Sequence, residues 1–161
     1  MGYVSCCDWW HSVTYSNKLN EATSSLGECK LIGELIVDIK GKNTGTRVLA
    51  DGKMEGSSAG SGSILGKEAT EMDTGVLAMM PNGVFMVEGN GMIMTAEGDT
   101  VMMKINGIGW FTGKGLKSSG RGAGYFMTGS LKLASLNKTV GVWERESEEN
   151  GDYIVKVWAW K

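Results

Sequence analysis

Histidine and cysteine, which build most metal sites and many catalytic ones, are scarce in this sequence. It contains one histidine, His11, and three cysteines, of which Cys6 and Cys7 are adjacent. One histidine excludes most catalytic triads, and a structural zinc site needs a second pair of Cys or His ligands that is missing here. An odd number of cysteines is also a poor basis for a disulfide framework. We therefore expect no metal, no cofactor and a reducing, cytoplasmic location.

Long apolar runs and a surplus of positive charge are missing as well. The longest apolar runs, such as residues 84–87, are far shorter than the roughly 20 residues of a membrane-spanning helix. The formal net charge is −2, whereas a nucleic-acid-binding protein normally carries a basic surplus on one face. The sequence therefore predicts a soluble protein with no membrane span and no nucleic-acid partner.

Proline is nearly absent, with one residue, whereas glycine is abundant, with 25 residues. A disordered glycine-rich chain would lack large apolar residues, but hydrophobic residues make up 42% of this one. We expect one β-barrel domain over residues 27–161. Residues 1–26 are an N-terminal extension without a regular hydrophobic period, which either caps one end of the domain or is partly disordered.

The stretch of residues 99–113 is apolar on both faces and has glycine at every second position near its end. Glycine inside a strand marks a bulge or a close approach of two backbones, so this pattern predicts a bent strand. Glycine pairs recur at residues 89–91 and 122–124. Such a recurrence is typical of successive strands that bend at one level of a barrel wall.

Hairpin signals separate most of the strand-like segments. The pairs at residues 51–52, 82–83 and 150–151 are Asp-Gly or Asn-Gly, which indicate tight turns between antiparallel neighbours. The favoured fold is therefore all-β, an antiparallel up-and-down barrel of roughly eight strands, with a β-sandwich as the alternative. The expected strands cover residues 31–40, 46–50, 53–65, 69–80, 84–96, 99–113, 121–128, 139–146 and 153–160, with a turn or bulge at 41–45 and a helical turn at 130–137.

Part of this pattern is similar to known families. Asp99-Thr100, followed by Gly107-x-Gly109-x-Phe111-x-Gly113, resembles the corresponding strand of allene oxide cyclases, and its G-x-G-x-F part is similar to dirigent proteins. Residues 87–89, Val-Glu-Gly, are similar to a Val-Gln-Gly of the same cyclases. From residue 107 to the end, the chain also resembles a family of small uncharacterised microbial proteins. The resemblance implies a calycin-like barrel of eight strands with a ligand cavity, often in a dimer or trimer.

The resemblance does not extend to the cyclase chemistry. Those enzymes carry a Glu-x-Asn pair on the first strand, whereas the nearest counterpart here, on a loose alignment, is Asp38-Ile39-Lys40. The acid is retained, but a cation replaces the neutral amide. Cyclisation of an allene oxide is therefore not expected of this chain.

The sequence of the central strands does not determine which of their two faces points into the barrel. Either the glycine register faces a packed interior and the polar register faces water, or the polar register turns inward and gives an apolar pocket a few hydrogen-bonding groups. In the second case Glu88, buried beside methionines, would have a raised pKa and could act as an acid or base near neutral pH. The candidate ligand-binding residues are Glu88, Asn90, Lys104, Asn106, Trp110, Arg121, Tyr125 and Trp143, and the candidate catalytic residues are Glu88 and Asp38.

Three functions fit these patterns. The first is a binding barrel that holds a small, largely apolar molecule. The second is a cofactor-independent cyclase or isomerase acting on a flexible unsaturated substrate. The third is a structural or interaction barrel with a filled core. The 11 methionines can fill a core or line an adaptable pocket. The apolarity of both strand faces predicts either a cavity together with a core or an oligomer interface on the outside, and the resemblance implies that such an oligomer is a homodimer or homotrimer.

Overall fold

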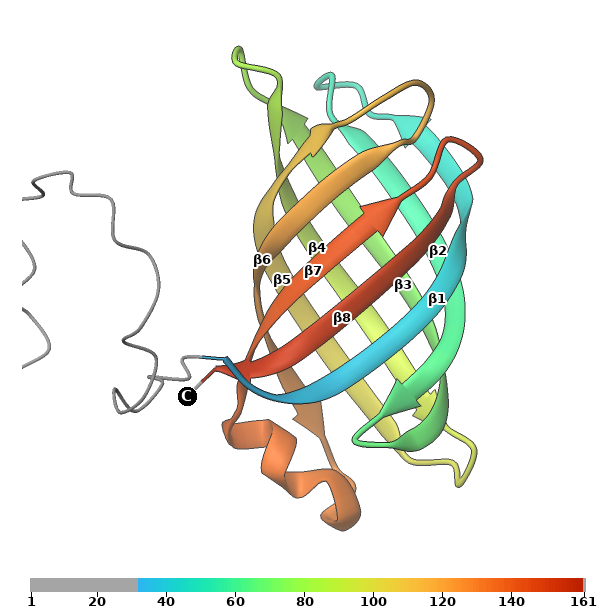
Figure 1. Ribbon diagram of the computed structural model, residues 1–161, viewed down its shortest axis with the longest axis vertical. Coiled ribbons are helices and arrows are strands. Elements are labelled where there is room, and N and C mark those ends of the chain that lie inside the picture. Colours follow the sequence, from blue (N-terminus) through green and yellow to red (C-terminus); the bar gives the residue numbers. More distant parts are fainter. Residues whose placement is uncertain (1–31, 161) are drawn as a thin grey trace, which may run out of the picture.

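A computed structural model describes residues 32–160, which form one closed antiparallel barrel (Figure 1). Each strand pairs with the next one in sequence, and the last strand pairs with the first. This is the up-and-down barrel that the sequence predicts, and the sandwich alternative is wrong. The predicted extension at residues 1–26 lies outside the described residues. The elements are β1 (Ile32–Val48), β2 (Met54–Ile64), β3 (Lys67–Met79), β4 (Val84–Thr95), β5 (Thr100–Phe111), β6 (Ser118–Thr128), the 3₁₀ helix η1 (Leu131–Lys138), β7 (Val140–Ser147) and β8 (Asp152–Trp160).

The hairpin turns lie where the sequence places them, and of the turn or bulge expected at residues 41–45 the structure shows a bulge. Gly52, Gly83 and Gly151 have φ values of 81°, 79° and 85°, a region that glycine enters without steric penalty. The segment at residues 41–45 does not end the first strand. Instead, the pairing of β1 with β2 shifts between Asn43 and Gly45, and β1 continues beyond this bulge to its end at residue 48.

The glycine register of the central strands faces the barrel interior. On β4, Phe85, Gly91 and Ile93 are buried, whereas Met86 and Glu88 are exposed. The same alternation runs along β5, where Val101, Met103 and Gly109 are buried. Because side chains alternate between the two faces of a strand, the polar residues between them lie on the outer surface.

The inward glycines leave room for aromatic rings that lie against the wall. A Cβ atom on Gly107 would come within 2.5 Å of Cζ2 of Trp143, and one on Gly122 within 2.6 Å of the same atom. The indole Nε1 donates a hydrogen bond to the carbonyl of Ala123 at 3.2 Å. The close approach that the glycines at residues 99–113 predict therefore exists, and the tryptophan of β7 fills it.

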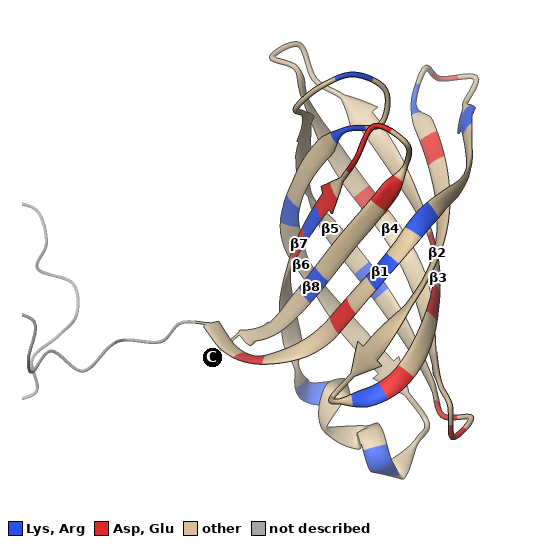
Figure 2. Cartoon of the chain, turned by 45° about the vertical axis from the view of Figure 1, so that its right-hand side comes forward, with Lys and Arg blue, Asp and Glu red and all other residues tan. Residues whose placement is uncertain are grey.

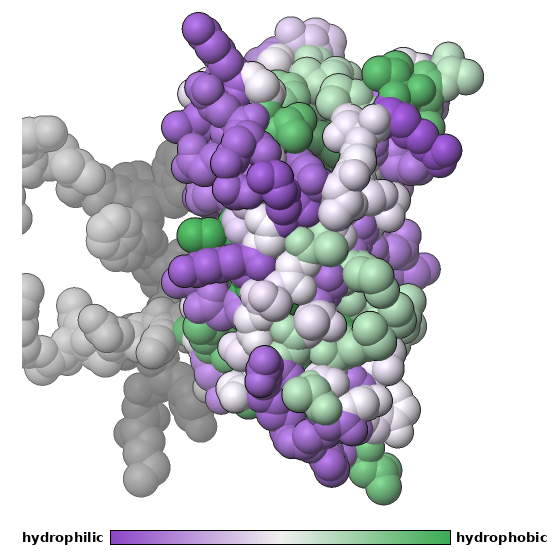
Figure 3. Space-filling model, turned by 90° about the vertical axis from the view of Figure 1, so that its right-hand side faces the viewer, coloured by the Kyte–Doolittle hydropathy of each residue, from purple (hydrophilic) through white to green (hydrophobic). Residues whose placement is uncertain are grey.

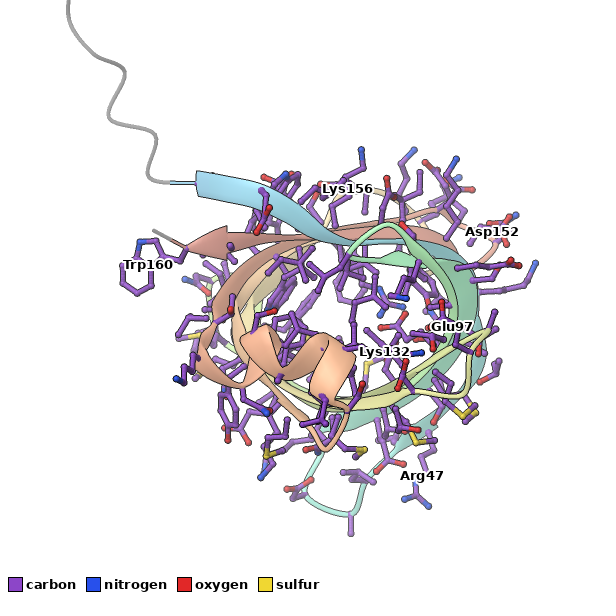
Figure 4. All side chains as sticks on the ribbon, turned by 90° about the horizontal axis from the view of Figure 1, so that it is seen from below. Arg47, Glu97, Lys132, Asp152, Lys156 and Trp160 are labelled. Atoms are coloured by element: carbon purple, nitrogen blue, oxygen red, sulfur yellow. The ribbon has the colours of Figure 1, made fainter. Side chains whose placement is uncertain are left out.

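One end of the barrel is closed by η1 (Figures 1 and 4). Its Leu133 and Leu136 are buried in the main hydrophobic core. Glu97, in the turn after β4, forms ion pairs of 2.8 Å with both Lys67 and Lys132, and Figure 4 shows Glu97 and Lys132 next to each other at this end. Hydrogen bonds from the two lysines, together with their charge, lower the pKa of Glu97 to about 2. These contacts attach the helix to the barrel wall.

The opposite end, at the top of Figure 1, carries the hairpin turns after β1, β3, β5 and β7. No helix of the described residues covers it. Charged residues recur on the outside along β1 and β8 and in the turns (Figure 2). Within residues 32–160, no helix has the length and apolarity needed to span a membrane.

Candidate functional site

The open end of the barrel contains a cavity of about 140 Å³. A cavity of roughly 150 Å³ in another protein holds one benzene molecule, so this volume suits a ligand of about one ring. Near the mouth, the walls are mainly apolar. They are formed there by Met54, Leu77, Phe85, Phe111 and Leu116, and the rings of Phe85 and Phe111 pack with their centroids 5.1 Å apart.

Deeper in the barrel lies a group of five polar side chains, which we call the lumen cluster: Ser58, Glu71, Asp73 and Arg145, which line the cavity, and Tyr153, which contacts Glu71. The Tyr153 hydroxyl donates to Oε2 of Glu71 at 3.0 Å, and the Ser58 hydroxyl donates to Oδ2 of Asp73 at 2.5 Å. Arg145 forms an ion pair of 3.4 Å with Asp73 and donates to Ser58 at 3.2 Å. Its guanidinium carbon also lies 3.8 Å from the centroid of the Tyr153 ring, in cation–π geometry.

Strand alternation and register bring these side chains together. Glu71 and Asp73 are two residues apart on β3, so both point inward, and Asp73 lies directly opposite Ser58 on β2. Tyr153 reaches the cluster from β8. Two glycines make room for its hydroxyl, because a Cβ atom on Gly41 or Gly60 would lie only 2.6 or 2.8 Å from that oxygen.

The environment of Glu71 changes its acidity. Burial raises the pKa of this carboxyl to about 7, and repulsion from Asp73 acts in the same direction. The hydrogen bond from Tyr153 and the charge of Arg145 only partly oppose the effect. Burial and the neighbouring carboxylates also raise the pKa of the Tyr153 hydroxyl above its usual value. At neutral pH the lumen therefore contains a carboxyl group that can give or take a proton.

Most of the site residues predicted from the sequence lie elsewhere. Glu88, Lys104 and Asn106 are exposed on the outer wall of β4 and β5, away from the cavity. Asn90 borders the cavity beside Gly91 but is itself exposed, in the same outward register as Glu88. Asp38, the second catalytic candidate, belongs to the outer face of β1, where its carboxylate lies 4.0 Å from Lys156.

The other candidates divide between the outside and the inside. Arg121 forms ion pairs with Glu144 at 3.4 Å and Glu146 at 2.8 Å, and it lies 6.0 Å from the centroid of the Trp110 ring. These side chains form an outer network on β5 to β7, and Tyr125 is exposed farther along β6. Trp143 alone among the aromatic candidates lines the cavity.

The lumen cluster itself was missed by the sequence analysis. One signal for it exists in β3, because Glu71 and Asp73 share a register with Ala69, Gly75 and Leu77. Acids in an otherwise apolar register indicate buried charge or a pocket. A second signal is Arg145, which lies in the same register as Trp143.

Within residues 32–160, no group of three or more His, Cys, Asp and Glu side chains is placed to hold a metal ion. Cys6, Cys7 and His11 lie outside this range, so the expectation that they bind no metal stays a prediction.

Comparison with known proteins supports the fold. No model of a known protein family matches the chain, and no curated protein sequence matches it. A conserved protein of unknown function from Rhodopseudomonas palustris superimposes with a TM-score of 0.67 at 13% identity, covering 78% of this chain and 94% of its own. A protein of unknown function from Clostridium acetobutylicum gives 0.66 at 14% identity, covering 80% and 98%.

A β-barrel-like protein from Acinetobacter baumannii gives a TM-score of 0.64 at 14% identity, covering 81% of this chain and 95% of its own. At such low identity these likenesses show the fold alone. None of these three proteins is described as an allene oxide cyclase or a dirigent protein. The chain is thus similar to uncharacterised β-barrel proteins, and the resemblance seen in the sequence is supported at the level of an eight-stranded barrel.

Proposed function

We propose that this chain is a cytoplasmic binding barrel, which holds a small, largely apolar molecule in the open half of its lumen. The observation that carries the proposal is the cavity, which is apolar at its mouth and ends on the lumen cluster. Small-molecule sites typically combine apolar walls for bulk with a few polar groups that fix the orientation of the ligand.

A lumen-filling variant tests this function. Gly56 lines the cavity, and a Cβ atom there would meet no neighbour closer than 4.0 Å, so Gly56→Leu should fold and occupy the ligand space. Ala59→Leu is the matched control, because Ala59 is exposed on the same strand. We expect Gly56→Leu to abolish binding of benzyl alcohol in an NMR titration and Ala59→Leu to retain it. Undiminished binding by Gly56→Leu would contradict a lumenal site.

Native mass spectrometry of the purified full chain complements this titration. We expect a co-purified small molecule whose mass is lost from the Gly56→Leu variant. If the molecule were equally abundant in the wild-type protein and in Gly56→Leu, its binding site would lie outside the lumen.

A cofactor-independent cyclase or isomerase is the second candidate function. The observation that favours it is Glu71, whose pKa of about 7 suits an acid or base within a cavity that can fold a flexible unsaturated substrate. For such an enzyme, Glu71→Gln would keep the affinity for a neutral unsaturated ligand and abolish its turnover. If the substituted protein still turned the ligand over, Glu71 would not be the catalytic acid or base.

A structural or interaction barrel with a filled core is the third candidate. It accounts for the end closed by η1 but not for the cavity at the other end, and we rank it below the other two.

We also propose that the barrel forms a homodimer or homotrimer through the outer face of β3 to β6. Met72, Met92, Met102 and Met127 are direct neighbours across these four strands, and Met72 is 48% exposed. Figure 3 shows hydrophobic side chains gathered among hydrophilic ones on one face of the barrel. A continuous apolar row on a surface favours association. Native mass spectrometry should show an oligomer that Met72→Lys combined with Met102→Lys dissociates, and a monomeric wild-type protein would contradict the proposal.

A further inference from the structure

The charged groups around the cavity are unequal in number. Among the described residues that line it, two are acids, Glu71 and Asp73, and one is a base, Arg145. With both acids ionised, the lumen carries one uncompensated negative charge. Any ligand that enters therefore meets a pocket of net negative charge or, when Glu71 is protonated, of zero charge.

The positive charge of the cluster is already engaged. Arg145 pairs with Asp73 at 3.4 Å, donates to Ser58 at 3.2 Å and lies against the Tyr153 ring. A carboxylate ligand would have to compete with Asp73 for this guanidinium and would lie close to two acids of its own sign. The lumen is thus poorly suited to fatty acids and other anions.

Glu71 is the acid without a direct cationic partner among the described residues. It is only 3% exposed, and its Oε2 accepts the hydrogen bond from Tyr153. No described residue donates a hydrogen bond to the other oxygen, Oε1. A buried carboxylate with one free oxygen beside a cavity is a site for a hydrogen-bond donor, and a charged donor would also balance its charge.

From this geometry we infer that the molecule held in the lumen is a small apolar amine, whose ammonium group donates to Glu71. The inference rests on the proposed function and adds that the ligand carries a positive charge. Asp73 balances Arg145, so the charge that the ligand meets is that of Glu71. The hydrocarbon part of the ligand then lies against Trp143 and Phe85 toward the mouth, in a volume of about 140 Å³ that limits it to about one ring.

Three probes that share one ring test the inference: benzylamine, benzyl alcohol and benzoate. They differ in charge but little in size, so their relative affinities for the full chain at pH 7 report the charge preference of the lumen. We expect benzylamine to bind at least about tenfold more tightly than benzyl alcohol, because a charge-assisted hydrogen bond replaces a neutral one. Benzoate should bind most weakly.

Proton release provides a second readout. Since the pKa of Glu71 is about 7, this carboxyl is about half protonated at pH 7, and an ammonium ligand should displace that proton. Calorimetry in two buffers of different ionisation enthalpy should detect release of about half a proton for each benzylamine bound. Benzyl alcohol should release none.

Glu71→Gln and Glu68→Gln are the matched variants. Both replace a glutamate of β3 by its amide, but Glu68 is exposed on the outer face whereas Glu71 is buried in the lumen. Glu71→Gln should weaken benzylamine at least about tenfold, abolish proton release and remove the preference for benzylamine over benzyl alcohol. Glu68→Gln should change none of these.

The outcomes separate the two proposals. If benzyl alcohol binds but benzylamine has no advantage, or if benzoate binds most tightly, the amine inference is overturned and the binding barrel stands. If benzylamine is preferred but Glu71→Gln does not weaken it, the ammonium does not bind at Glu71. If none of the three probes binds, the proposed function fails together with the inference.

Discussion

The two ends of the barrel lumen are lined by the same alternation of inward residues, yet one is filled and the other is hollow. At the end closed by η1, the inward positions carry large aliphatic side chains such as Ile39, Ile64 and Ile93, none of which has any exposed surface. At the open end, the corresponding positions include Gly56 and Gly75, which leave the cavity free.

This difference assigns separate roles to the two ends. Burial of apolar side chains is the main source of folding free energy, so the packed end should carry most of the stability. The open end tolerates a buried acid and an ion pair, which cost stability but provide chemistry. Four predictions test this division, in order of decreasing effect on the free energy of unfolding.

The largest effect should come from an aromatic ring at the packed end. Phe126→Ala should lower the free energy of unfolding by about 3 to 5 kcal/mol, because Phe126 is fully packed in the core. Phe111→Ala is the counterpart at the mouth, where the ring is 39% exposed, and it should cost about 1 kcal/mol. Denaturant unfolding measures both, and equal losses would contradict a difference in packing between the ends.

The seal formed by η1 can be tested within one helix. Leu133 is 0% exposed and Leu131 is 94% exposed, so the same change to alanine should destabilise the protein to very different extents. Leu133→Ala should cost about 3 kcal/mol through the cavity that it leaves, and Leu131→Ala less than about 0.5 kcal/mol. Urea unfolding of the pair decides this, and a tolerated Leu133→Ala would mean that η1 does not seal the core.

Stability should also depend on pH through Glu71. The native protein keeps the Glu71 proton up to about pH 7, whereas the unfolded chain loses it near the ordinary value of 4.5. Between these values the native state binds more protons, so the free energy of unfolding falls as pH rises, by ~3 kcal/mol over the whole window.

Glu71→Gln should remove this part of the pH dependence, since an amide does not titrate, and Glu68→Gln should keep it. Unfolding curves of the three proteins between pH 4.5 and 7.5 give the comparison. An unchanged slope in Glu71→Gln would show that another group is responsible.

The smallest effects concern two inward glycines. Gly107→Ala should cost about 2 kcal/mol, because its Cβ would lie 2.5 Å from the Trp143 ring and also close to the Arg121 carbonyl. Gly75→Ala should stay within about 0.5 kcal/mol of wild type, since the nearest atom to its Cβ would be 3.7 Å away. Thermal unfolding measures the stability of both variants. A Gly107→Ala variant as stable as wild type would contradict the close packing of the Trp143 ring against this glycine.

Local signals in the sequence were sufficient to predict the barrel fold. The Asn-Gly and Asp-Gly pairs specify tight turns, and glycines such as Gly107 and Gly109 specify close approaches, because both effects act between near neighbours on the chain or on adjacent strands. The residues of the site could not be predicted in the same way. Glu88 follows Val87 and Glu71 precedes Met72, and nothing in these immediate neighbours tells which of the two glutamates is buried.

The sequence by itself determined an all-β chain, its hairpin turns and the glycine register that bends the wall. Tertiary structure alone decided which register faces the lumen and which side chains meet there. Ser58, Glu71, Arg145 and Tyr153 come from four different strands, and the acidity of Glu71 follows from burial and from groups up to 82 positions away in sequence. A property that depends on closure of the whole barrel cannot be read from any one of its strands.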